Sequence, residues 1–313
     1  MHTRSPFLPP WMIALACGSL VMTIAIGVRQ VCGLFLRPVT GDLGFSREVF
    51  GLAIGLQNLV WGLTQPFAGL MADRIGARPI VIVTGCCYAL GLGIAAVASD
   101  SIVFTLGLGV LVGLGQSGTT YAVILALIGR LVPDAQRSRY LGLASAAGSV
   151  GMFLMVPATS VLLDLVEWRT TFLVLAAIAA TIPLLAVWLA EKRASAAMGV
   201  SATPASSAFA AATADRDYWL LNLGFASCGF QLAFIATYLP TILTEGALSM
   251  AIAAAVLACI GPSTSRARIS AASPAAASPR RACWRRSISR GVRSFSAFSH
   301  CRYRPRRPSS SQL

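Results

Sequence analysis

The sequence predicts an all-α membrane protein with an N-terminal six-helix bundle, one to two further helices and then a disordered basic tail. Of its 313 residues, 56% are hydrophobic and only 12% are charged, whereas about 25% of the residues in a soluble domain are charged. Long uncharged runs recur, for example at 49–72 and 79–99. Each of these runs is long enough to cross a bilayer as a helix.

The hydrophobic runs give the order of the helices. The first begins at Trp11, continues to about Leu36 and contains Arg29; the next six are predicted at 49–72, 79–99, 101–129, 140–163, 170–190 and 218–244. An eighth helix begins near Gly246 and stops at about Ile260. The predicted domains are the bundle at 1–193, a cytoplasmic linker at 194–216, the start of a second bundle at 217–260 and the tail at 261–313. The linker is too poor in large apolar residues to fold by itself.

Basic residues are distributed unevenly between alternate loops. One set of loops, together with the N-terminal segment, holds nine Lys and Arg residues, and the opposite set holds three. Cytoplasmic loops carry the excess of positive charge in membrane proteins. We therefore expect a multi-pass protein of a bacterial inner membrane with a cytoplasmic N-terminus.

The tail at 261–313 differs from the rest of the chain. It contains 12 Arg and no acidic residue, while residues 1–260 have a net charge of only +2. Arginine at a helix centre costs about 2.5–3.5 kcal/mol on insertion, so the tail is not a membrane span. One interpretation is a basic arm for lipid headgroups or nucleic acid. We favour an out-of-frame translation, because a helix stops midway and the acidic residues vanish at once; no nucleic-acid partner is then expected.

Metal, redox and nucleotide sites are not predicted. Most of the eight cysteines lie within apolar runs, and their spacing matches no zinc or redox motif. Paired glycines such as Gly109 and Gly113 suit close helix packing and have no phosphate-loop context. The sequence therefore predicts neither an enzyme nor a cofactor.

Charged residues and glycines gather between the second and third runs. They are Gly69, Asp73, Arg74, Gly76 and Arg78. We expect Asp73 to end one helix and Gly76 to permit a tight reversal within a charged hairpin of five residues. This stretch resembles the signature between helices 2 and 3 of the major facilitator superfamily, although Pro79 stands at the last basic position. The resemblance implies a membrane transporter in which Asp73 binds a helix end of the other half and governs closure. Alternatively, these charges only anchor the topology.

A carrier of that family needs a polar pocket near the bilayer midplane. Arg29 is the one basic residue inside an apolar run, so it is a functional candidate. It resembles the helix 1 basic residue of monocarboxylate transporters, although it could instead snorkel to the outer interface. Polar side chains at helical spacing supply further substrate-binding candidates, namely Gln57, Asn58 and Gln65, then Gln116 and Tyr121, then Gln231 and Tyr238. Each set could equally make ordinary hydrogen bonds between helices.

Two further segments narrow the resemblance to the monocarboxylate and oxalate/formate porters. They are the sequences 139–142 and Trp168-Arg169, while Gly109 replaces an Arg that is usual in drug exporters. We predict a secondary transporter of a small organic anion such as a monocarboxylate, with protons as a candidate coupling ion and the lipid bilayer as its surroundings. The chain is expected to be an inactive fragment, because alternating access needs two bundles. The alternatives are a dimerising half-transporter and a non-transporting scaffold or regulator with a basic cytoplasmic tail.

Overall fold

The computed structural model describes residues 10–133, 136–189, 213–245, 252 and 255–256, and every element it defines in this part of the chain is helical. Six helical segments are long and apolar enough to cross a membrane: Trp11–Leu43, Ala77–Val97, Ser101–Leu131, Arg137–Leu165, Trp168–Val187 and Tyr218–Leu243. Most of the predicted linker and eighth helix, and all of the predicted tail, lie outside the described residues.

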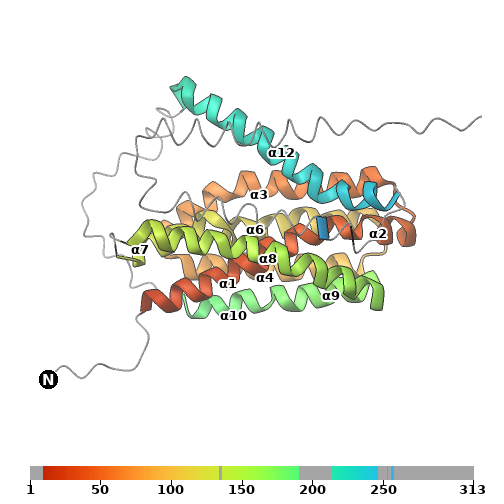
Figure 1. Cartoon of the computed structure of the whole chain (residues 1–313), viewed down its shortest axis with the longest axis horizontal. Coiled ribbons are helices and arrows are strands. Elements are labelled where there is room, and N and C mark those ends of the chain that lie inside the picture. Colours follow the sequence, from red (N-terminus) through yellow and green to blue (C-terminus); the bar gives the residue numbers. More distant parts are fainter. Residues whose placement is uncertain (1–9, 134–135, 190–212, 246–251, 253–254, 257–313) are drawn as a thin grey trace, which may run out of the picture.

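The helices form an elongated bundle with α1 close to its centre (Figure 1). The first span comprises α1 (Pro10–Val31), the 3-10 turn η1 (Cys32–Phe35) and α2 (Leu36–Leu43). It is followed by α3 (Arg47–Ile75), α4 (Ala77–Val97), α5 (Ser101–Thr105), the π-helical turn η2 (Leu106–Leu111), α6 (Val112–Thr119) and α7 (Tyr121–Leu131). The remaining helices are α8 (Arg137–Leu165), α9 (Trp168–Ala179), α10 (Thr181–Val187) and α12 (Arg216–Glu245).

Helix α3 confirms the helix predicted at 49–72, and it is 29 residues long. It is not among the six most apolar segments, because it carries polar side chains such as Gln57, Asn58 and Gln65. Its N-terminus is capped by Ser46, whose hydroxyl accepts a hydrogen bond from the Val49 amide at 3.4 Å. The structure therefore places a partly polar helix among more apolar neighbours.

The turn between α3 and α4 is shorter than the sequence suggested. Helix α3 continues through Asp73 and Arg74 to Ile75, and α4 begins at Ala77. The expected five-residue hairpin is therefore wrong, because Gly76 alone reverses the chain with a φ of +97°. We call this end of the bundle the Asp73 end and the opposite end the Asp42 end.

At the Asp42 end, Arg169 ties three elements together. Its guanidinium donates hydrogen bonds to the carbonyls of Ala96 (3.1 Å) and Ala98 (2.9 Å) at the end of α4, and it lies 3.5 Å from an Asp42 oxygen. The Trp168 indole donates to the same Asp42 oxygen at 3.1 Å and lies beneath the guanidinium. Acceptors that a helix C-terminus leaves unpaired are thus satisfied by a side chain of α9.

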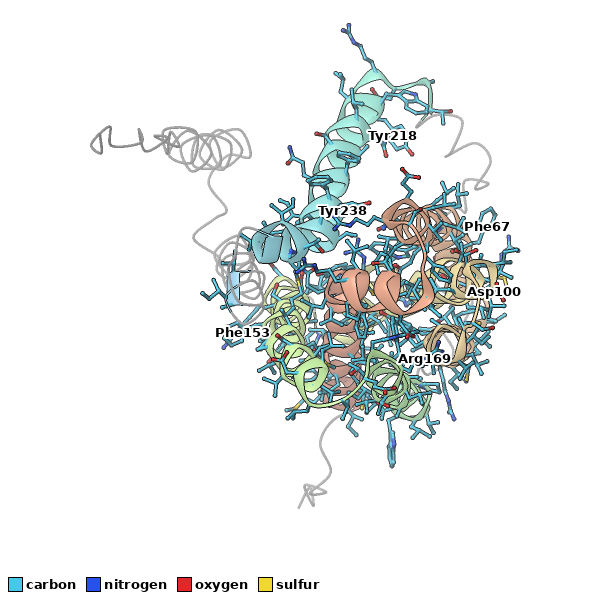
Figure 2. All side chains as sticks on the ribbon, turned by 90° about the vertical axis from the view of Figure 1, so that its right-hand side faces the viewer. Phe67, Asp100, Phe153, Arg169, Tyr218 and Tyr238 are labelled. Atoms are coloured by element: carbon cyan, nitrogen blue, oxygen red, sulfur yellow. The ribbon has the colours of Figure 1, made fainter. Side chains whose placement is uncertain are left out.

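Helix α12 contacts the bundle mainly through its C-terminal half. A Cβ atom at Gly33 of η1 would collide with the Ala236 carbonyl and lie 2.9 Å from Thr237 Cα, so the two backbones touch there. Toward its N-terminus α12 diverges from the bundle (Figures 1 and 2), with Tyr238 beside the other helices and Tyr218 away from them. The ribbons of α12 and α3 therefore separate toward the Asp73 end (Figure 1).

Candidate functional site

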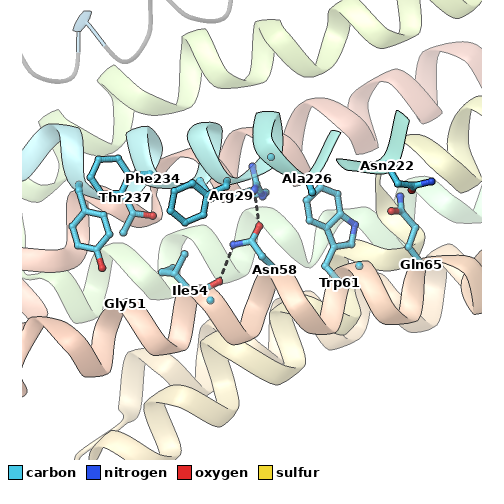
Figure 3. A pocket seen from close by; sticks show the side chains of 16 residues that line it. Arg29, Gly51, Ile54, Asn58, Trp61, Gln65, Asn222, Ala226, Phe234 and Thr237 are labelled. Carbon is cyan, nitrogen blue, oxygen red and sulfur yellow. Dashed lines mark hydrogen bonds between the residues drawn. The ribbon is translucent and has the colours of Figure 1, made fainter. Parts of the chain in front are cut away.

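A cavity of about 1010 Å³ lies between α3 and α12 and reaches Arg29 of α1. One wall carries Asn58, Trp61 and Gln65 from α3, and the other is formed by α12 (Figure 3). At the Asp42 end the cavity is bounded by Gly51 and Tyr238. Among the described residues that line it, Arg29 is the one that carries a charge, and none is acidic.

Arg29 is half-buried in the last turn of α1 and points toward the middle of α3. Its Nη2 donates a hydrogen bond to Asn58 Oδ1 at 2.8 Å, and its Cζ lies 4.9 Å from the centre of the Trp61 ring. A cation at that distance is stabilised by about 0.5–2 kcal/mol, depending on how far it is desolvated. The guanidinium is therefore held against α3 without an ion pair to any described acidic residue.

Both partners of Arg29 are themselves fixed. Asn58 donates through Nδ2 to the Ile54 carbonyl at 2.8 Å, which leaves its Oδ1 for the guanidinium. The Trp61 indole donates to the Thr120 hydroxyl at 3.2 Å. The site is thus positioned by α3 and by the junction of α6 and α7.

The opposite wall of the cavity is largely apolar and aromatic. Helix α12 contributes Phe230 and Phe234, whose rings stack with centroids 6.4 Å apart, and Tyr238, whose ring lies 5.2 Å from that of Phe234. Asn222 and Thr237 are the polar residues on this wall besides Tyr238. The cavity therefore offers one cationic group facing an aromatic surface.

The predicted binding residues divide into three groups. Arg29, Asn58, Gln65 and Tyr238 line the cavity, and Gln57 lines a small recess beside Arg29. Gln116 and Tyr121 lie within the bundle and line neither space. Gln231 is exposed on α12 and lines neither space, so its role in binding stays a prediction.

Comparison with known proteins now gives the family. The sequence matches the family profile of the Major Facilitator Superfamily over residues 11–275. The chain belongs to the major facilitator superfamily. The match includes the first 15 residues of the predicted out-of-frame tail, so it gives no support to a break at residue 261.

Curated relatives of this facilitator include transporters with different names. It is 30% identical to monocarboxylate transporter 11 of Homo sapiens over an alignment of 181 residues, and this alignment covers 56% of this chain and 38% of that protein. It is 34% identical over 131 residues to multidrug resistance protein MdtH of Cronobacter sakazakii, covering 42% and 32%. It is 29% identical over 165 residues to monocarboxylate transporter 3 of Mus musculus, covering 52% and 32%. Each match therefore spans less than two fifths of the relative.

In this facilitator Asp73 of the family motif pairs within its own bundle. Its Oδ1 accepts a hydrogen bond from Arg130 Nη1 at 2.7 Å, which joins the last turn of α3 to the last turn of α7. Arg74 and Arg78 are exposed, and a Cβ atom at Gly69 would meet no atom within 4 Å. The expected contact with a helix of the other half remains a prediction.

Several site residues were missed from the sequence. Arg130 is one of the basic residues that the loop count includes, and a basic residue at the end of one helix can pair with an acid at the end of another. Trp61 lies midway between Gln57 and Gln65 at helical spacing, which is the signal that could have identified it, and its indole position depends on Thr120. Asn222, an amide in a largely apolar segment, was the available signal for the polar part of α12.

Proposed function

We propose that this facilitator binds a small organic anion, such as a monocarboxylate, at Arg29 and belongs to a secondary transporter of that anion. The observation that carries the proposal is the charge of the cavity, in which one guanidinium faces a space without a described acidic residue. A cation in a low-dielectric site is costly unless an anion neutralises it. A carboxylate would supply the missing charge and accept two parallel hydrogen bonds.

The cavity walls support an anion with an apolar body. Trp61 and the aromatic residues Phe230 and Phe234 border the space that faces Arg29. Ligand pockets typically combine such apolar surfaces with a few polar groups that fix orientation. The names of the monocarboxylate transporter relatives agree with this choice of substrate class.

The orientation of the chain in the membrane determines the side to which the cavity opens. The positive-inside rule puts the N-terminus and the Asp73 end in the cytoplasm. The cavity then faces the cytoplasm, and the contact of α12 with Gly33 closes it on the other side. Residues 1–193 would form one bundle and residues 217–260 the start of the second, with protons as the candidate coupling ion.

Binding of radiolabelled benzoate to the purified full-length chain in nanodiscs tests the proposal. We expect Arg29→Ala to weaken binding at least about 30-fold, since removing one member of a buried charge pair costs about 2 kcal/mol or more. Arg29→Lys should retain part of the affinity. Arg139→Ala, which removes one exposed positive charge from the first turn of α8, is the matched control and should bind like the wild type.

Three results would contradict the proposal. Equal benzoate binding by the wild type and Arg29→Ala would show that the guanidinium does not hold the anion. Binding of a lipophilic cation such as ethidium, with no binding of benzoate, would favour a cation exporter. If neither probe binds, the scaffold interpretation becomes the better one, and membrane recruitment of a partner by the tail would be its test.

A further inference from the structure

Beside the main cavity lies a recess of about 10 Å³ between α1, α3 and α12. It is bordered by Arg29 and Cys32 on one side, by Gln57 and Asn58 on the second and by Thr237 on the third. A space of roughly 10–15 Å³ measured in this way holds one water molecule. The recess is therefore of the right size for a single oxygen atom and its protons.

Gln57 is the unexplained group at this recess. Its side chain is 2% exposed, and its Nε2 has no hydrogen-bond partner among the described residues. Buried amide groups are nearly always paired, so an orphaned donor points to a partner that the protein chain does not supply. The partner of an N–H donor must be an acceptor.

The other groups at the recess also favour an acceptor. Asn58 Oδ1 is taken by Arg29 and its Nδ2 by the Ile54 carbonyl. The Cys32 thiol already donates to the Val28 carbonyl at 3.6 Å. Arg29 has five N–H donors, of which one is directed at Asn58, so the guanidinium has donors left for a second ligand atom.

We propose that the recess between Arg29 and Gln57 binds one oxygen acceptor, held by N–H groups of α1 and α3. In the empty protein this oxygen belongs to an ordered water. In the loaded protein an oxygen next to the carboxylate of the anion replaces the water, and Gln57 thereby determines specificity. The water site stands without the proposed function, whereas the ligand oxygen rests on it.

The sign of a stability change tests the water site. Gln57→Met keeps the length of the side chain and removes the amide. If the amide binds a water, we expect the midpoint of thermal unfolding of the purified full chain to fall by about 2–4 °C. An unchanged or higher midpoint would overturn the proposal, because an orphaned amide is relieved by an apolar replacement. Gln136→Met, which changes an exposed amide directly before α8 that lines neither space, is the control and should leave the midpoint within about 1 °C.

Acetate and glycolate, which differ by one hydroxyl, test the ligand oxygen. We expect the wild type and Gln136→Met to bind glycolate at least about fivefold more tightly than acetate, and Gln57→Met to bind both alike. A fall in midpoint with an unchanged glycolate preference would assign the recess to water alone. A preference that survives in Gln57→Met without a fall in midpoint would overturn both. Failure of the proposed function differs from these outcomes, since neither acid would then depend on Arg29.

Discussion

Arg29 is positioned by three residues that share one side of α3. Ile54, Asn58 and Trp61 follow each other at intervals of four and three residues, so they lie along one side of the helix. The Ile54 carbonyl accepts a hydrogen bond from the Asn58 amide nitrogen. The Asn58 oxygen and the Trp61 ring then contact the guanidinium of Arg29. A shift of α3 by one residue would rotate this side by about 100° and remove every contact.

The Asp73–Arg130 pair is short but exposed, with 62% and 35% of the two side chains accessible. Exposed ion pairs contribute about 0.2–1 kcal/mol and weaken with salt. A double-mutant cycle of Asp73→Asn and Arg130→Gln, measured by unfolding in detergent, should give a coupling of no more than about 1 kcal/mol that declines in about 1 M salt. A coupling above about 2 kcal/mol, insensitive to salt, would contradict a solvent-screened pair.

At the scale of elements, the span from 101 to 131 is the most irregular. It contains the π-helical turn η2 and breaks at Thr120, where the backbone is extended between α6 and α7. Hydroxyls before the break bond to carbonyls of the preceding turn, from Ser117 to Leu114 and from Thr119 to Gly115. Such bonds compete with the helix ladder and bend helices. The sequence predicted one continuous helix here, since hydropathy does not register local backbone geometry.

The turn between α3 and α4 depends on Gly76. Its φ of +97° and ψ of 154° form a backbone conformation that is open essentially to glycine. We expect Gly76→Ala to lower the free energy of unfolding by about 1–3 kcal/mol, measured by denaturation in detergent.

Gly69 provides the control for that substitution within the same motif. It lies inside α3, and an added Cβ would meet no atom within 4 Å. Gly69→Ala should therefore be neutral or stabilising by up to about 1 kcal/mol. Equal effects of the two substitutions would show that backbone conformation at Gly76 is not what limits the turn.

At the scale of the whole molecule, the sequence predicted the order of the spans better than their contacts. Hydropathy located most of the described helix ends within about three residues, because burial in lipid acts on every residue of a span. The first span is the exception, since it continues through α2 to Leu43, beyond the predicted end at about Leu36. Hydropathy also selected Arg29 and Asn58, since polar groups in such spans are few. It could not show which side of α12 lines the cavity, because that side depends on the crossing angle between helices. The Asp73 partner was missed for the same reason, since Arg130 is distant in sequence.

The docking of α12 depends on Gly33. A methyl group there would collide with the Ala236 carbonyl, whereas one at Gly224 would meet nothing within 4 Å. We expect Gly33→Ala to accelerate amide hydrogen exchange at 233–241 at least about tenfold, because the C-terminal half of α12 must move away from η1. Gly224→Ala is the control and should exchange like the wild type. Identical protection of 233–241 in both variants would contradict a backbone contact at Gly33.

The guanidinium of Arg169, which joins α9 to α4 and Asp42, binds backbone and side-chain acceptors. Two of its three acceptors are peptide oxygens, of Ala96 and Ala98. Replacing either alanine by another residue keeps the backbone carbonyl, so substitutions at these two positions do not remove the acceptors of the two hydrogen bonds. Its vulnerability is concentrated in a single codon, that of Arg169, and a lysine there would reach fewer of the three acceptors at once.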